Sequence, residues 1–321
     1  MINRPRHQMF RMRMPLALLV IWTIAFACGD HRRTGPEDQI ESFDISADDR
    51  HILMLHSLRG ATDIFEMNTA GGTPRRILKA PANEIWSNPR YAPDGKKMVF
   101  IKRFKNKFWE GLVIMCNVDG TEMEELTHGG EFVTEAIFSA YGHEILFCSA
   151  QQYNTSKKKG TTTVRGFDIY ALNLSDRQVT RLSMLNVDGI DNLTEINDQY
   201  LLFHVRGGKK SGVFSFEKKN PTRVLRIFPY NGTVESQVLD KPGFVPDRFI
   251  AFTAQNELFL MNLDTRENKL IYDAQGGHLI ELLKGFHHKA GLLFKKFDET
   301  TFTQLNADGT GATTIAVEFP Q

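Results

Sequence analysis

Short apolar stretches separated by polar turns recur along most of the chain, and their lengths are those of strands rather than helices. The clearest unit runs from Tyr91 to Thr127 and has two turn signals, APDG and DG, between its apolar runs. Asp-Gly between such runs is a strong hairpin signal. An extended stretch, IWSNPRY, leads into the first turn, so the unit has four strands. Outside the N-terminal leader, no long run has the apolar spacing of a helix.

The same order of turns and strands occurs six times. Corresponding apolar residues lie in the first apolar run after each turn, at Met54, Phe100, Phe147, Phe203, Phe252 and Phe294. Their spacings are 46, 47, 56, 49 and 42 residues, near the period of about 40–50 residues in propeller blades. The longest spacing contains a polar insertion, 153–166, that predicts an exposed loop. The sequence therefore predicts an all-β fold, a six-bladed β-propeller of four-stranded antiparallel blades over residues 40–321.

The N-terminal segment has the composition of a secretory signal. Four arginines and no acid precede a thirteen-residue apolar run at 15–27. A membrane span needs about 20 residues, so the run fits the h-region of a signal peptide better. We expect 1–27 to be a signal peptide and 28–39 a short linker. The alternative is an anchor helix that is never cleaved.

Cys28 directly follows this apolar run. A small residue followed by cysteine at this place resembles the lipobox of bacterial lipoproteins, in which the cysteine is acylated and becomes the N-terminus. We therefore expect an exported protein held on a membrane of the cell envelope by lipid at Cys28, facing the periplasm or the cell surface. The alternative is an ordinary signal cleaved after Ala27, with no role for Cys28.

Charge and cysteine content narrow the choice of partners. Without the four leader arginines, 35 basic residues stand against 38 acidic ones, a net charge of −3. Nucleic-acid-binding proteins carry a basic footprint instead, so we expect no nucleic-acid partner. Cys116 and Cys148 lie in apolar strands of neighbouring repeats, and we expect both to be buried and unpaired. No cysteine and histidine spacing indicates zinc.

The APDG turn at 92–95, with VIMCNVDG and EELT after it, resembles the repeat of TolB-type propellers, S-P-D-G-x-x-I-x-F followed by I-Y-x-x-D-x-D-G and x-x-L-T. The match is good in the second copy, partial in the first and third, and degraded in the last three. The resemblance covers residues 40–318. It implies the fold strongly and the function only weakly, because one fold hosts many functions. TolB proteins carry an additional N-terminal α/β domain, and only about a dozen residues separate Cys28 from the first blade. The resemblance therefore does not imply the role of TolB in envelope translocation.

Acidic residues stand near the start of each strand expected to be innermost. They are Glu41, Glu84, Glu135, Asp191, Glu235 and Glu281. Innermost strands line the channel of a propeller, so these carboxylates would form an acidic mouth that attracts a cation or a basic partner. The alternative is chance, because 38 of the 321 residues are acidic. Apart from the covalent lipid we expect no cofactor, and a channel cation is the one ion that such a mouth would accept.

Two further groups of residues are candidate sites. Phe104, Phe108 and Trp109 fall in a predicted loop, RFKNKFWEG, where aromatic and basic residues together are typical of an interface anchor. The alternative is a loop folded onto the blade edge. The pair His287-His288 occupies the turn where other copies carry Pro-Asp-Gly, which favours an exposed turn over a site.

The sequence identifies no catalytic residue and no metal ligand. It has no G-x-S-x-G elbow and no set of histidine ligands, and we expect no hydrolase domain after Gln321. We expect a monomeric, non-enzymatic binding or scaffold module that recognises an envelope protein or glycan through a propeller face or the channel. The alternative is a carbohydrate-active lyase or hydrolase at the channel. Converging histidine, arginine and carboxylate groups would favour the enzyme, and an apolar patch on one face would favour the binding module.

Overall fold

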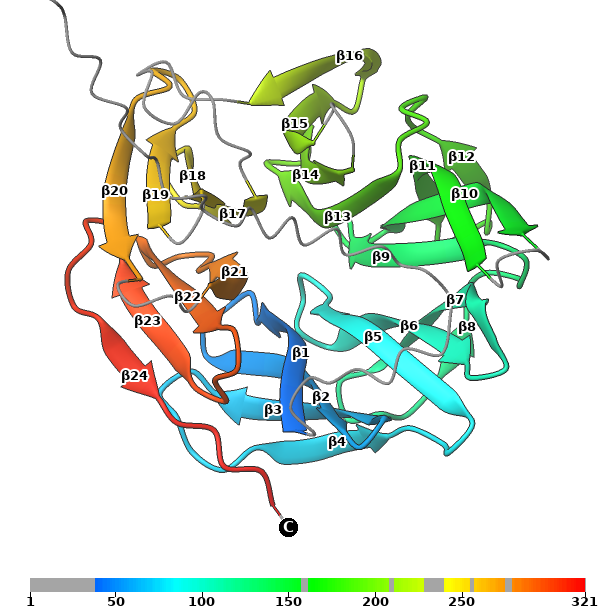
Figure 1. The fold of residues 1–321 in the computed structure, drawn as a ribbon, viewed down its shortest axis with the longest axis horizontal. Coiled ribbons are helices and arrows are strands. Elements are labelled where there is room, and N and C mark those ends of the chain that lie inside the picture. Colours follow the sequence, from blue (N-terminus) through cyan, green and yellow to red (C-terminus); the bar gives the residue numbers. More distant parts are fainter. Residues whose placement is uncertain are drawn as a thin grey trace, which may run out of the picture.

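The computed structural model describes residues 38–156, 161–207, 211–227, 240–254, 257–274 and 279–320. In these segments the chain forms six antiparallel sheets of four strands each. The sheets radiate from a common centre and follow one another around it in chain order (Figure 1). The predicted six-bladed propeller is confirmed. Over the same segments, no helix is long and apolar enough to cross a membrane.

The first strand of each blade is innermost and the fourth is outermost (Figure 1). From blade 1 to blade 6 the strands are β1 (Asp38–Ile45), β2 (His51–Leu58), β3 (Ala61–Asn68), β4 (Arg75–Lys79); β5 (Glu84–Tyr91), β6 (Lys97–Phe104), β7 (Lys107–Asn117), β8 (Glu124–Glu125); β9 (Phe132–Phe138), β10 (Glu144–Ser156), β11 (Thr161–Asn173), β12 (Val179–Arg181); β13 (Gly189–Ile196), β14 (Tyr200–Arg206), β15 (Gly212–Glu217), β16 (Asn220–Ile227); β17 (Asp240–Val245), β18 (Phe249–Ala254), β19 (Glu257–Asn262), β20 (Asn268–Asp273); β21 (Ile280–Gly285), β22 (Gly291–Lys296), β23 (Phe302–Asn306) and β24 (Thr313–Ile315).

Turns form where the sequence signals them. In blade 2, Gly95 and Gly120 have φ values of 68° and 87°, which glycine adopts without strain. A Cβ atom on Gly120 would lie 2.6 Å from the Leu78 side chain of blade 1. The DG turn therefore also allows the close approach of blades 1 and 2.

Three details differ from the prediction. The insertion 153–166 is not a loop, because β10 and β11 continue as a paired hairpin to Ser156 and Thr161. The threonines of this insertion are polar, which leads to the prediction of an exposed loop, but threonine is β-branched and also favours strands. The stretch RFKNKFWEG is likewise a tight hairpin, since β6 ends at Phe104 and β7 begins at Lys107. Blade 1 begins at Asp38, two residues before the predicted boundary.

The hydrophobic core of the described segments consists of six clusters, each lying between two neighbouring blades. The repeated apolar residue of each second strand belongs to a different cluster, and all six are at most 1% exposed. Phe203 of blade 4 shares its cluster with Ile169 of blade 3. Phe252 of blade 5 shares its cluster with Val213 of blade 4. Each repeated side chain thus packs toward the preceding blade, which holds the sheets in a ring.

The ring closes by packing blade 6 against blade 1, without exchange of a strand between them. Phe43 and Phe302 contact edge to face, with 4.8 Å between ring centroids. Beyond β24 the chain runs alongside blade 1 (Figure 1), where Val317 forms a β-bridge with Gly72. Phe319 then stacks on a histidine ring of β2 at 3.7 Å. The segment after the last strand therefore joins the two ends of the propeller.

A buried carboxylate adds a polar link to this closure. Asp49, in the β1–β2 turn, is 1% exposed. It accepts hydrogen bonds from the backbone N–H groups of His287, His288 and Lys289 at 2.6, 2.8 and 3.0 Å. The histidine pair therefore lies in an exposed turn of blade 6, as expected, and its backbone ties that turn to blade 1.

Cys116 and Cys148 are unpaired and buried, as predicted. Burial raises the pKa of the Cys116 thiol to about 12, and it raises the pKa of Cys148 well above its usual value. A thiolate is poorly solvated in an apolar interior. Because the thiolate is the reactive form, both residues act as small apolar side chains.

The repeated second-strand residue generates a stability prediction. Phe203→Ala removes a fully buried ring from the cluster of blades 3 and 4, so we expect a loss of about 3–5 kcal/mol in the free energy of unfolding. Phe297→Ala removes a ring that is 44% exposed and is the matched control, with an expected change within about 0.5 kcal/mol. Urea denaturation followed by circular dichroism measures both. Equal losses in the two variants would contradict the structural role of the repeated residue.

Candidate functional site

The acids predicted to mark the channel mouth lie on innermost strands wherever the structure describes them. These are Glu41 on β1, Glu84 on β5, Glu135 on β9, Asp191 on β13 and Glu281 on β21. Glu235 lies outside the described residues. Blade 5 has a different acid at this level, because Asp240 pairs with Thr253 of β18 as Asp191 pairs with His204 of β14. Asp240 is therefore the counterpart of Asp191 in blade 5.

A β-bulge interrupts each innermost strand close to these acids. In blades 4 and 5 the bulge begins directly after Asp191 and Asp240, at Asn192 and Lys241. These bulge residues have φ values of 52° and 48°, which are uncommon outside glycine. Bulges re-aim side chains and are frequent beside functional sites. The repeated bulge therefore accounts for the way both carboxylates turn toward the seam between blades 4 and 5.

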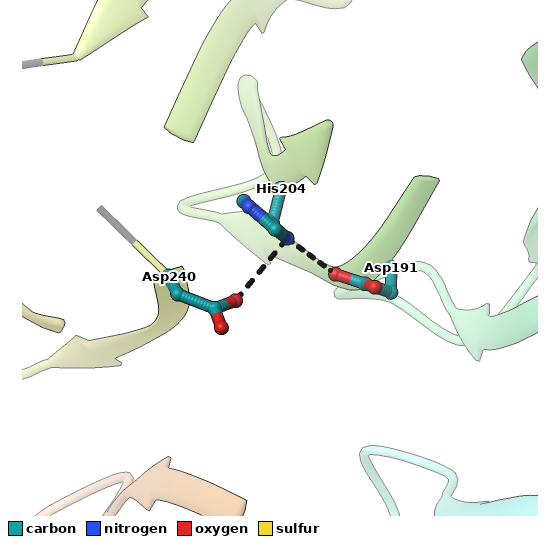
Figure 2. Close-up of side chains that lie close together, drawn as sticks. All are labelled: Asp191, His204 and Asp240. Atoms are coloured by element: carbon teal, nitrogen blue, oxygen red, sulfur yellow. Dashed lines mark hydrogen bonds and ion pairs between the residues drawn. The ribbon is translucent and has the colours of Figure 1, made fainter. Parts of the chain in front are cut away.

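Three side chains meet at this seam, and we call them the seam cluster: Asp191, His204 and Asp240 (Figure 2). The Nδ1 atom of His204 lies 2.9 Å from Asp191 Oδ1 and 3.3 Å from Asp240 Oδ1. His204 is 5% exposed, whereas the Asp191 and Asp240 side chains are 24% and 39% exposed. The cluster is thus closed behind the imidazole and open to solvent on the carboxylate side.

Basic side chains hold the outer oxygens of both carboxylates. Arg206 Nε lies 2.6 Å from Asp191 Oδ2, and Lys241 Nζ lies 2.8 Å from Asp240 Oδ2. Burial by itself would raise the pKa of Asp240, but the Lys241 ammonium and His204 hold it below its usual value. Asp240 is therefore ionised at neutral pH, with Oδ1 directed at the imidazole.

Other predicted mouth acids also have partners. Glu135 is buried and lies 3.4 Å from the Arg90 guanidinium of blade 2, and Glu281 lies 2.6 Å from Lys295. Glu84 accepts a hydrogen bond at 2.7 Å from a tryptophan indole of its own strand. These contacts reduce the negative charge that the mouth would present as a whole. The acidic ring stays a prediction, and the seam cluster is the place where two carboxylates converge.

Lys284 of β21 lies where the innermost strands of blades 6 and 1 meet. Its Nζ atom is 3.8 Å from Asp44 Oδ1 of blade 1. Burial lowers the pKa of Lys284 to about 8, the charge of Arg90 lowers it as well, and the carboxylates of Asp44 and Glu135 oppose both effects. A shifted lysine in a channel is a candidate functional group, although here its neighbours form a network of paired charges.

Phe104 and Trp109 lie on the strands of the β6–β7 hairpin rather than in a loop. Phe104 packs partly buried against the cluster of blades 1 and 2, with Lys102 Nζ 5.4 Å from its ring centroid. Trp109 is partly buried, and the Phe108 side chain lies outside the described residues. The interface role of these aromatics stays a prediction.

In the described part of the chain, the seam cluster is the one group of at least three His, Cys, Asp or Glu side chains whose ligand atoms converge. A nitrogen and two carboxylate oxygens can share a proton or hold a cation. The hydrogen-bond partner of His204 within this part is a carboxylate rather than a hydroxyl or thiol group, so the geometry is not that of a nucleophile with its base.

Sequence reasoning found Asp191 but missed His204 and Asp240. A usable signal exists, because Asp191 and Asp240 are separated by the same 49 residues as Phe203 and Phe252. His204 directly follows the repeated phenylalanine. The equivalent positions in the other blades hold Leu55, Ile101, Cys148, Thr253 and Lys295. A histidine at this position is therefore specific to blade 4.

The architecture is that of a six-bladed propeller, and solved structures with similar folds superpose on it. TolB from Acinetobacter baumannii gives a TM-score of 0.59 at 14% identity, over 80% of this chain and 63% of that one. An oligogalacturonate lyase in complex with manganese gives 0.60 at 9% identity, over 86% and 77%. At such identities the likeness shows the fold alone.

In sequence, the chain is similar to the Tol-Pal system protein TolB of Wolinella succinogenes, with 23% identity over 188 residues. The match covers 57% of this chain and 41% of that relative, so the chain spans less than half of the relative's length. No family model matches the chain. The resemblance of the repeats to those of TolB is confirmed by these comparisons.

Lys284→Met tests the network of paired charges through its pH dependence. The folded-state pKa of about 8 lies below the unfolded value near 10.5, so the unfolded chain binds more protons between these pH values and stability rises with pH. We expect wild-type stability to rise over this range by up to about 3 kcal/mol relative to the variant. Denaturant titrations at several pH values measure the difference, with exposed Lys269→Met as the control. Parallel pH profiles for wild type and Lys284→Met would show that the lysine is not perturbed.

Proposed function

We propose that the protein is a non-enzymatic binding propeller of the bacterial cell envelope, exported by its N-terminal signal and tethered to a membrane by lipid at Cys28. The observation that carries this proposal is the sequence similarity to TolB, a protein of the Tol-Pal system. The shared six-bladed fold supports it. The partner is an envelope protein or a glycan, and the propeller acts as a monomer.

One face of the propeller offers apolar side chains to such a partner. Successive strands alternate in direction, so all innermost strands begin on the same face, where the second-to-third strand connections also lie. We call this the start face. Its exposed apolar side chains include Leu58, Met184, Leu279 and Phe297. Exposed apolar groups of this kind gain free energy when a partner removes them from water.

The tether leads to the same face. Strand β1 begins on the start face at Asp38, ten residues after Cys28. Ten residues span at most about 35 Å, so lipid at Cys28 keeps the start face within that distance of the membrane. The β6–β7 hairpin with Phe104 and Trp109 also lies on this face. This arrangement favours a partner at the membrane surface.

A carbohydrate-active lyase or hydrolase is the second candidate. The fold shared with an oligogalacturonate lyase and the seam cluster favour it. Against it, Arg90 is paired with Glu135, and Lys284 lies beside Asp44. Side chains that bind or transform a substrate in a channel are expected to point at the substrate rather than to form ion pairs with one another. A binding role accounts for more of the observed contacts.

Cys28→Ala tests the tether. We expect the wild-type protein in the membrane fraction and labelled by radioactive palmitate, and the variant unlabelled in the soluble periplasmic fraction, because the acyl chains supply the membrane affinity. Cys116→Ala is the matched control, since that cysteine is buried and its loss leaves the tether intact. Membrane retention of Cys28→Ala would refute the lipid anchor and favour the uncleaved helix.

Photo-crosslinking in living cells tests recognition by the start face. A photoreactive residue at Met184 or Phe297 should capture an envelope protein or glycan. Leu225 and Leu270, on the outermost strands β16 and β20, are similarly exposed to Phe297 and are the controls that should capture less. Stronger capture at the outer strands would contradict the choice of face. Cleavage of an envelope glycan by the purified protein would support the enzyme instead.

A further inference from the structure

We propose that the seam cluster is a binding site for a divalent transition-metal ion of the zinc class, held by His204 Nδ1, Asp191 Oδ1 and Asp240 Oδ1. Such an ion would bridge blades 4 and 5. The site does not depend on an envelope partner, because all three ligands belong to this chain.

The spacing of the donor atoms suits a shared ion. Ligand atoms about 2.1 Å from one ion, at angles between 90° and 109°, are about 3.0–3.4 Å apart. The observed separations from His204 Nδ1 to the two carboxylate oxygens are 2.9 and 3.3 Å, and all three donor atoms lie within 4.8 Å of one another (Figure 2). A small shift of partly exposed side chains is enough to place an ion among them.

The buried imidazole is the second observation that points to an ion. His204 is 5% exposed, and its Nε2 atom has no hydrogen-bond partner in the described part of the chain. The ring is aimed into the cluster, because its Nδ1 atom faces one carboxylate oxygen from each of the two blades. A metal ion among these atoms contacts the nitrogen and both oxygens at once.

The surrounding bases act as outer partners of the ligands. Arg206 and Lys241 contact the Oδ2 atoms of Asp191 and Asp240 and leave the Oδ1 atoms facing the imidazole. Groups that orient ligands in this way are typical of metal sites. Their positive charge also offsets that of the two carboxylates, so we expect a dissociation constant in the micromolar range rather than the tighter values of closed structural zinc sites.

The donor set selects the type of ion. Imidazole nitrogen suits zinc, nickel and copper, whereas calcium and magnesium prefer sites made wholly of oxygen. Three protein ligands leave one tetrahedral position for water or for an oxygen of a bound molecule. The partly exposed carboxylates place that position on the solvent side of the cluster, away from His204.

Metal titration of the full-length, untagged protein tests the site. After treatment with EDTA, isothermal titration with Zn²⁺ should show one saturable site that raises the melting temperature, and Ca²⁺ should bind at least about tenfold more weakly. Asp240→Asn keeps the shape of a partly exposed side chain but removes a charged ligand, so we expect at least about tenfold weaker Zn²⁺ binding. Asp264→Asn, which breaks the exposed ion pair with Arg248 in the same blade, should bind Zn²⁺ within about twofold of wild type.

Co²⁺ gives a second readout that does not depend on heat. Its visible absorption in the wild-type protein should show the bands of a site with nitrogen and oxygen ligands, and these bands should be lost in Asp240→Asn and in His204→Gln. If His204→Gln does not fold, the Asp240→Asn comparison decides. Absence of a saturable Zn²⁺ site in the wild type, or equal Zn²⁺ affinity of Asp240→Asn and Asp264→Asn, would overturn the proposal. A site that prefers Ca²⁺ over Zn²⁺ would overturn it as well.

Discussion

The packing of each blade against the next is the constraint on which the rest of the structure depends. A four-stranded sheet has two faces to bury, and here each face is covered by a neighbouring blade. A fully buried aromatic side chain contributes about 1.5–3 kcal/mol from burial, but every such contribution belongs to a seam rather than to a blade. The seam of blades 6 and 1 therefore has to form as well. There the repeated residue is Met54, and Phe302, Asp49 and the segment after β24 reinforce the contact.

This packing brings six unpaired strand edges to the centre, and polar groups on those edges need partners. Asp44 and Glu135 each take contacts from neighbouring blades, and His204 links blades 4 and 5. Blades 5 and 6 meet differently, because a Cβ atom on Gly285 would lie 1.8 Å from the Phe244 carbonyl oxygen. There the two backbones themselves are in contact. The charged side chains at the centre therefore contribute to the contacts between blades, whether or not a ligand binds there.

The fold was predictable because burial at every seam requires a large apolar residue at the same place in each repeat. The period of that residue is kept even in the repeats that lack the turn motifs. The site was less predictable because it depends on register. Glu235 stands close to the expected start of the innermost strand of blade 5, whereas that strand begins at Asp240 and a bulge follows it directly. A bulge leaves no mark in an apolar pattern, so only comparison with the equivalent positions of blade 4 could have identified Asp240. For the same reason, the residues that contact Asp191 could not be predicted from the sequence around Asp191.

The seam cluster differs from the other charged contacts of the centre in a way that bears on function. Glu135 and Glu281 are each opposed directly by a base, Arg90 and Lys295. At the seam, two acids face one histidine and their bases stand outside. Innermost strands begin on the start face, so the Asp191 and Asp240 carboxylates lie toward the face that carries Met184. A partner that approaches this face meets apolar side chains around a polar centre, and the polar centre supplies directional specificity that apolar burial alone lacks.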